Sequence, residues 1–258
     1  MLTQIDHVVI VTRDLDTAVA GYRELGFTVV PGGRHSVGTH NALIALADAA
    51  YVELIAFLDP DTPQPHRWWQ PRQAGGGLVD FCAATSDFAG DVAAVRRAGV
   101  EIDEPRPMSR TRPDGYVLRW TLASPREPHR GLVPFLIADD TPRRERVPAE
   151  TAHANGVTAL GAITIAVTDL AGVSRWYAAL LGQAGTPGRR DDLGARTHRF
   201  TIGGHVVELA MPDRADSPLT GPLVQRGAGP YAATFRTARG VRRPLDERAS
   251  QGARLWVE

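Results

Sequence analysis

The amino-acid sequence predicts an α+β fold made of tandem βαβββ units. In the first 58 residues, short stretches rich in β-branched residues flank one amphipathic stretch, so strands and a helix are expected in a fixed order. The same order returns 155 residues later, where Val207-Glu208-Leu209 matches Val52-Glu53-Leu54 and Asp169-Leu170 matches Asp14-Leu15. Matches at one spacing near both ends of a unit indicate an internal duplication.

The first unit consists of a strand, a helix and three further strands. Residues 5–11 (IDHVVIV) have the composition of a strand. Asp14 is placed to cap a helix whose apolar residues recur every three or four positions up to Leu25, and Gly26 can end that helix. The three further strands are expected at residues 27–30, 41–46 and 51–57.

Three more copies of the unit follow. The fourth starts at residues 231–236, has a helix-like stretch interrupted by Pro244, ends in one strand at 254–257 and is expected to lack its final two strands. A polar stretch with two prolines, residues 139–156, separates the second copy from the third. We therefore predict two domains, residues 1–140 with units at 1–58 and 77–139, and a degenerate domain at 157–258.

The composition excludes several classes of protein. The 29 acidic residues balance 29 basic ones, so no net charge favours nucleic acid or an anionic membrane. Every basic residue is arginine, which excludes lysine Schiff-base enzymes and P-loop enzymes and is typical of a high-GC bacterial genome. Cys82 is the only cysteine, so the chain has no internal disulfide or thiolate zinc site. With no signal peptide and no long apolar run, a cytoplasmic protein is expected.

The repeated unit resembles that of the vicinal oxygen chelate superfamily, which includes glyoxalase I, bleomycin-resistance proteins and extradiol dioxygenases. The resemblance is carried by His7 on the first strand, Asp14-Leu15 at the helix start and the final strand Tyr51-Val52-Glu53-Leu54. The run at 38–44 (GTHNALI) is similar to the branch called glyoxalase-like domain proteins. The resemblance implies units paired into curved mixed sheets that form open barrels, with the second pair truncated.

The resemblance also implies metal ligands on the first and fourth strands of each unit. These ligands would be His7, Glu53 and Asp80, while the last ligand place falls near Phe135. Such a set suits Mn²⁺, Fe²⁺, Ni²⁺, Zn²⁺ or Mg²⁺, which can hold adjacent oxygens of a substrate, and Glu53 would also be the catalytic base. Alternatively, Glu53 forms an ion pair with an arginine and Asp80 binds backbone. In the third unit Ala162 replaces the histidine, so the second domain is expected to be structural.

Candidate substrate contacts lie in loops and on strands near these ligands. His40 and Asn41 follow a glycine that could bend a strand toward the pocket. Trp68 and Trp69 lie in the loop between the first two units, where they could form an aromatic lid or pack on the second domain. Arg119, with Arg110 and Arg112 as alternatives, could pair with a carboxylate or phosphate.

These residues favour a metal-dependent lyase, isomerase or dioxygenase-type enzyme acting on a small oxygen-rich molecule. The alternative, favoured by the incomplete ligand set, is a metal-free protein that binds or sequesters a small molecule, as bleomycin-resistance proteins do. A small molecule is the expected partner, without nucleic acid or membrane. The strand edge at 254–257 leaves a homodimer open.

Overall fold

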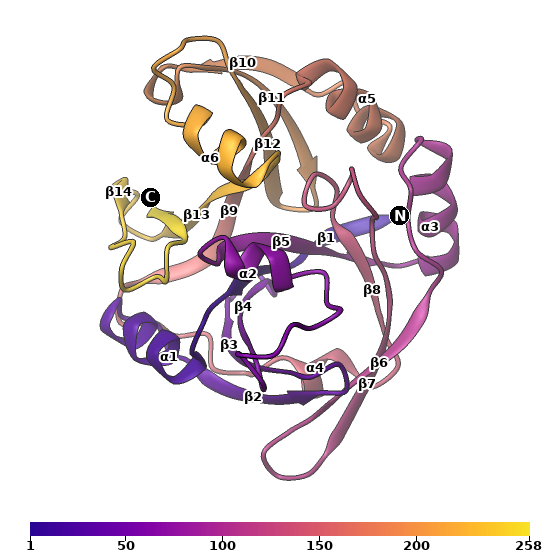
Figure 1. Cartoon of the computed structure of the whole chain (residues 1–258), viewed down its shortest axis with the longest axis vertical. Coiled ribbons are helices and arrows are strands. Elements are labelled where there is room, and N and C mark those ends of the chain that lie inside the picture. Colours follow the sequence, from indigo (N-terminus) through magenta and orange to yellow (C-terminus); the bar gives the residue numbers. More distant parts are fainter.

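The computed structural model describes residues 1–258, which form two curved mixed sheets (Figure 1). The first is an eight-stranded barrel in the order β1-β4-β3-β2-β6-β7-β8-β5. Its strands are β1 (Leu2–Val11), β2 (Val30–His35), β3 (Thr39–Ala45), β4 (Tyr51–Phe57), β5 (Gly77–Thr85), β6 (Arg106–Thr111), β7 (Val117–Ala123) and β8 (Phe135–Asp139). The tandem βαβββ units and their pairing into a curved mixed sheet are thereby confirmed.

The barrel is closed rather than open because the two units pair along two lines. One is the long antiparallel pair β1 and β5. The other is a short antiparallel seam between β2 and β6, where Arg34 pairs with Thr111 and His35 with Arg110. The seam brings side chains of both units to one place, since paired residues point to the same face of a sheet.

Aspartate side chains cap helices of this fold, and the first of these caps, Asp14, is the one that the sequence predicts. The Asp14 side chain accepts a hydrogen bond from the Thr17 amide at the start of α1 (Leu15–Glu24), and Asp87 accepts one from Gly90 at the start of α3 (Phe88–Arg97). Between the larger elements lie two short helices, α2 (Trp69–Gln73) and α4 (Arg143–Arg146).

The second sheet has seven strands in the order β10-β11-β12-β9-β13-β15-β14. Its strands are β9 (Val157–Ala166), β10 (Thr186–Arg190), β11 (Ala195–Ile202), β12 (His205–Pro212), β13 (Gly229–Thr237), β14 (Arg243–Pro244) and β15 (Arg254–Val257). It carries α5 (Leu170–Leu181), a 3₁₀ turn η1 (Asp191–Leu193) and α6 (Thr220–Arg226).

The register of the two sheets confirms the duplication in space. Val9 pairs with Glu53 between β1 and β4, and Thr164 pairs with Glu208 between β9 and β12. Both strand pairs are parallel. Residues 155 positions apart therefore occupy equivalent places in the two sheets.

The fourth unit differs from the expectation in which elements it lacks. β15 pairs in parallel with β13, as β8 does with β5, so residues 254–257 form the fourth strand of the unit. This pairing lets Leu255 and Val257 bury their side chains in the same core as Phe235. No helix follows β13, and β14 has only two residues.

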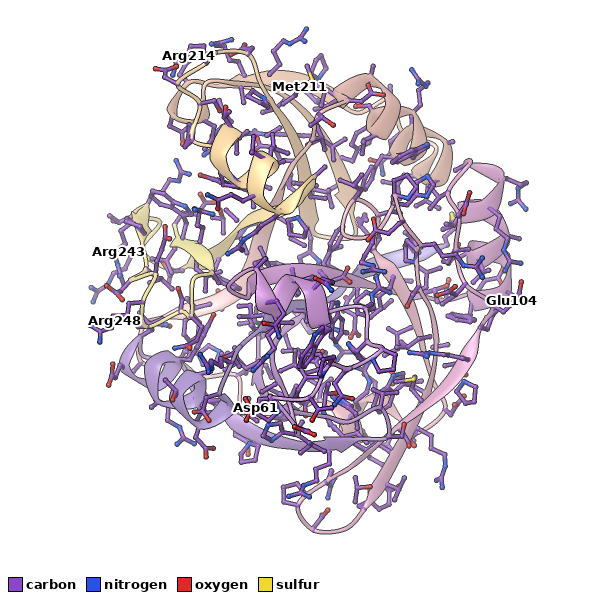
Figure 2. The ribbon with its side chains drawn as sticks, viewed as in Figure 1. Asp61, Glu104, Met211, Arg214, Arg243 and Arg248 are labelled. Carbon is purple, nitrogen blue, oxygen red and sulfur yellow. The ribbon has the colours of Figure 1, made fainter.

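The two sheets share one core of 43 buried residues drawn from both halves of the chain. The hydroxyl of Tyr22 on α1 donates to the Ser250 carbonyl at 3.2 Å, and that of Tyr177 on α5 donates to Leu132 at 2.8 Å. Exposed charged side chains such as Glu104, Arg214 and Arg248 lie around the periphery (Figure 2). None of the helices is both long and apolar enough to cross a membrane.

Candidate functional site

The interior of the barrel contains a cavity of about 60 Å³, which is space for a few water molecules. Its apolar wall includes Trp68, Trp120 and Phe135. Its polar wall includes His7, His35, Tyr51, Glu53, His66, Arg110 and Arg146. The cavity is therefore a small, mixed-polarity site in the first half of the chain.

Glu53 on β4 lies at the centre of the polar wall and is 6% exposed. The His7 Nε2 atom is 3.5 Å from its Oε2 atom, and the His35 Nε2 atom is 3.6 Å from its Oε1 atom. The Asn41 side-chain amide donates a 2.7 Å hydrogen bond to Oε1. Strands β1, β2, β3 and β4 each supply one member of this group.

Each histidine of this group is fixed through its other ring nitrogen. The His7 Nδ1 atom is 2.8 Å from an Asp6 carboxylate oxygen, and the His35 Nδ1 atom is 2.9 Å from the Thr39 hydroxyl. The contact of Nδ1 with Asp6 fixes the ring of His7 so that its Nε2 atom points toward Glu53. Burial lowers the pKa of His35 to about 4, against the opposing influence of Glu53, so the ring is neutral at pH 7.

These three side chains fit a divalent metal ion. Two imidazole Nε2 atoms lie within 3.6 Å of the oxygens of one buried carboxylate, which is an arrangement that a cation could occupy. Two histidines and one carboxylate also form a donor set that binds borderline divalent metals. His7, His35 and Glu53 could therefore hold such an ion.

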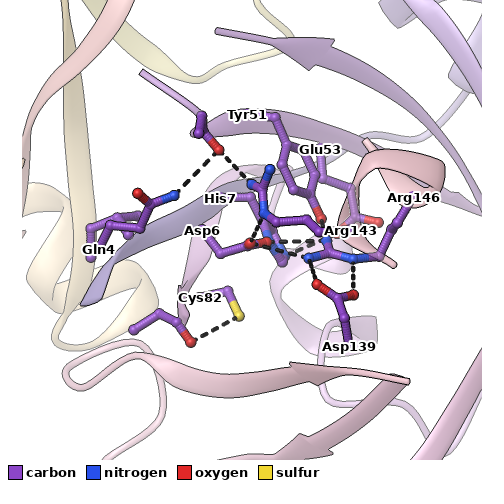
Figure 3. Close-up of polar contacts among 12 residues, drawn as sticks. Gln4, Asp6, His7, Tyr51, Glu53, Cys82, Asp139, Arg143 and Arg146 are labelled. Carbon is purple, nitrogen blue, oxygen red and sulfur yellow. Dashed lines mark hydrogen bonds and ion pairs between the residues drawn. The ribbon is translucent and has the colours of Figure 1, made fainter. Parts of the chain in front are cut away.

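Beside His7, a buried ion-pair network joins α4 to β1, β4 and β8 (Figure 3). Arg146 on α4 donates to both oxygens of Asp6 at 3.1 Å, to Asp139 at 2.9 Å and to the Tyr51 hydroxyl at 2.8 Å. Burial would raise the pKa of Asp6, but Arg146, His7 and Arg143 together hold it well below its usual value. Asp6 is therefore a carboxylate that orients His7.

Asp6, His7 and Cys82 form a second close group of possible metal ligands. Its carboxylate is already neutralised by Arg146, at 3.1 Å. Burial raises the pKa of the Cys82 thiol, which disfavours the thiolate that binds metals. An added cation would also approach the Arg146 guanidinium, so the group around Glu53 is the better metal site.

Asp80, the third ligand expected from the sequence, is bonded to other groups and is absent from the cavity lining. It is fully buried and accepts a 2.9 Å hydrogen bond from the Trp68 indole. Arg67 forms an ion pair with it at 2.9 Å, and the Phe81 amide donates to it at 3.0 Å. Asp80 thus anchors the loop that carries Trp68, and its oxygens do not line the cavity.

The five expected substrate contacts are divided between the inside and the outside of the barrel. Trp68 lines the cavity, and Asn41 reaches it through Glu53. Trp69 packs against Phe57 with ring centroids 5.0 Å apart, outside the cavity lining. His40 is only partly buried and Arg119 is exposed, because each alternates along its strand with inward-facing neighbours.

Sequence reasoning missed His35 as a site residue and did not select Arg110. The second strand was expected at 27–30, whereas β2 runs from Val30 to His35 and has a bulge between Pro31 and Gly33. No strand was assigned at β6, although the buried Met108 and Arg110 alternate there with more exposed residues. That alternation is the signal that could have identified Arg110.

The equivalent glutamate in the second sheet has different neighbours. Glu208 is 2% exposed and accepts from Arg190 at 2.9 Å and from Arg199 at 2.7 Å. Gly161 and Ala162 stand where the barrel has Asp6 and His7. Glu208 is therefore a paired structural carboxylate.

Comparisons with known proteins agree with this architecture. A search of curated protein sequences finds no match. Among solved structures, a hypothetical protein from Staphylococcus aureus is similar over 99% of this chain and 98% of its own, with 12% identity and a TM-score of 0.69. A mutant 4-hydroxymandelate synthase from Streptomyces coelicolor is similar over 92% of this chain and 72% of its own, with 17% identity and a TM-score of 0.62. At these identities the likeness shows the fold alone.

The family comparison covers more than half of the chain. The model of the family described as "Glyoxalase-like domain" matches residues 5–181, which include all of the barrel except the first three residues of β1, and the beginning of the second sheet. The matched range contains His7, His35 and Glu53. The chain therefore belongs to the glyoxalase-like domain family.

Proposed function

We propose that the barrel is a metal-dependent active site of lyase, isomerase or dioxygenase type that accepts a small oxygen-rich molecule. His7, His35 and Glu53 hold the divalent ion, which is Mn²⁺, Fe²⁺, Ni²⁺, Zn²⁺ or Mg²⁺. The observation that supports this proposal is that two anchored histidines direct Nε2 atoms at one buried carboxylate, at 3.5 and 3.6 Å. When bound, the ion supplies Lewis acidity toward oxygen atoms of the substrate.

The protein's own groups provide proton transfer and exclusion of water. The Asn41 amide holds one oxygen of Glu53 at 2.7 Å, so the other oxygen, Oε2, is the candidate to accept a proton from a substrate carbon. Trp68 and Trp120 cover the apolar side of the cavity. The cavity of about 60 Å³ favours a small substrate.

A second candidate function is metal-free binding of a small molecule in the same cavity. It is favoured by the second unit, where Phe135 occupies the place equivalent to Glu53 and offers no ligand atom. The register supports that equivalence, because Cys82 pairs with Phe135 as Val9 pairs with Glu53. Asp80, the other expected ligand of that unit, is already bonded to Trp68 and Arg67.

Elemental mass spectrometry on untagged protein, followed by titration with each of the five ions, tests the proposal. We expect about one ion per chain, lost in H7A, H35A and E53Q. The matched control is H198A, a histidine on β11 whose ring contacts Ser174, and it should retain the ion. Circular dichroism checks that each variant is folded. Protein that binds none of the ions would refute the metal site and favour metal-free binding.

A further inference from the structure

Arg110 on β6 is a buried cation without an acidic partner. It is 3% exposed and lines the barrel cavity. One terminal nitrogen donates to the Arg146 carbonyl at 2.7 Å, while Nε has no hydrogen-bond partner. Burying a charged group without a partner is strongly unfavourable, so such a group calls for a function.

The other buried charges around the cavity are matched. Arg146 forms ion pairs with Asp6 and Asp139, and Arg67 forms one with Asp80. No carboxylate oxygen lies within 4.0 Å of a guanidinium nitrogen of Arg110. Arg110 is therefore the one buried arginine of the cavity wall without an ion pair, since Arg106, which also lines the cavity without one, is exposed.

The seam between β2 and β6 places this cation beside the proposed metal ligands. Arg110 is paired in register with His35, so their side chains are neighbours on the inner face of the barrel. The His35 Nε2 atom is in turn 3.6 Å from Glu53. A ligand whose anionic end contacts Arg110 would have its adjacent atoms next to His35 and Glu53.

We propose that Arg110 binds the carboxylate of the substrate, and that the site therefore accepts small monocarboxylic acids. This inference rests on the proposed function, because it uses the same cavity and names the class of its ligand. A guanidinium presents parallel N–H donors that match the two oxygens of a carboxylate. A single buried arginine without an ion pair suits a carboxylate of charge −1 better than a phosphate of charge near −2, and the cavity of about 60 Å³ suits a short acid.

Titration with a matched pair of probes tests the inference. Glycolate carries the carboxylate, whereas glycolamide has nearly the same shape without the charge. In chelator-treated, metal-free protein, we expect glycolate at a hundredfold excess over its Kd to raise Tm by about 5 °C and glycolamide to have no effect. Equal effects of the two probes would overturn the inference, and so would a stronger effect of inorganic phosphate.

Variants at Arg110 separate binding from a structural role. R110M should weaken glycolate binding at least tenfold by calorimetry, while leaving Tm without ligand unchanged or raised, because it removes an unpaired buried charge. The matched control is R119M, which replaces an exposed arginine on β7, and it should bind glycolate as the wild type does. A glycolate affinity in R110M equal to that of the wild type would overturn the inference. If R110M does not fold, the acid–amide difference in the wild type decides the question.

The metal-free titration also keeps this inference distinct from the proposed function. If no metal ion binds but glycolate is preferred over glycolamide through Arg110, the metal site fails and the carboxylate site stands. If a metal ion binds at His7, His35 and Glu53 but the acid and amide behave alike without it, the metal site stands and the carboxylate site fails.

Discussion

Glu53 in the barrel and Glu208 in the second sheet occupy the same place in a duplicated unit, and both are buried. Glu53 is surrounded by two histidines and an amide. Glu208 is surrounded by two arginines that donate hydrogen bonds to it. The ion pair with arginine that the sequence left open for Glu53 is found at its counterpart instead.

The difference shows how one scaffold gives a carboxylate two roles. In the barrel, Asp6 forms the ion pair with Arg146 and orients His7. Glu53 therefore has no arginine partner and remains available to a ligand. In the second sheet, Gly161 replaces Asp6, and a side chain at that position would meet Arg236 at 3.2 Å. A buried glutamate thus becomes structural when cations of the protein itself neutralise it.

The largest expected effect on stability comes from breaking the ion pair between Arg146 and Asp6, which has no counterpart at Gly161 in the second sheet. R146M leaves Asp6 buried with its main partner removed, so we expect a loss of about 4 kcal/mol in the free energy of unfolding at pH 7. Urea unfolding monitored by fluorescence measures it. R144M, an exposed neighbour on α4, should change stability by less than about 0.5 kcal/mol.

The difference between R146M and the wild type should also depend on pH. The pKa of Asp6 is lowered in the folded state, so its stabilisation is complete above the unfolded-state pKa of about 3.9 and is lost as the pH falls toward the folded value. A stability difference that stayed constant down to pH 2 would contradict this assignment.

Substituting the two equivalent glutamates should separate binding from stability. E53Q should weaken metal binding by at least about 100-fold, measured by calorimetry, because it removes a charged ligand. E208Q should leave metal binding unchanged and lower the free energy of unfolding by about 2 kcal/mol, since it breaks ion pairs whose arginines are partly exposed. The opposite pattern, with the ion lost only in E208Q, would place the metal site in the second sheet.

His66, which lines the barrel cavity, should have a smaller effect, on the pH dependence of the free energy of unfolding. Burial and the nearby Arg67 and Arg106 lower its pKa from 6.5 to about 4. The unfolded chain then binds a proton that the folded chain does not, so stability is complete above pH 6.5 and falls by about 2 kcal/mol as the pH drops to 4. H66Q should remove about one proton from the slope of unfolding free energy against pH in this interval. An unchanged slope would show that His66 is protonated in the folded protein.

The smallest expected effect is that of A162H, which we expect to gain no metal ion in the second sheet. A162H restores a histidine beside Glu208, but Arg190 and Arg199 already neutralise that carboxylate. We therefore expect the metal content per chain of A162H to equal that of the wild type by elemental mass spectrometry. A second ion in A162H would show that the histidine alone distinguishes the two sheets.

The sequence was sufficient to predict the repeat, the cap at Asp14, and the strands that carry His7 and Glu53. Each of these depends on local pattern or on a spacing that recurs. His35 could not be placed because a bulge at Pro31 and Gly33 interrupts the alternation along β2. Local patterns also carry no information on Arg146, which meets Asp6 across 140 residues of chain.

The contact of Arg146 with Asp6 affects the point during translation at which the barrel becomes fully stable. The last barrel strand ends at Asp139, but Asp6 keeps a buried negative charge until residues 143–146 reach it. During synthesis on a ribosome, the barrel therefore cannot reach its final stability when its eighth strand emerges. A chain cut at residue 140 would contain every strand of the barrel and still lack the arginine that neutralises its interior.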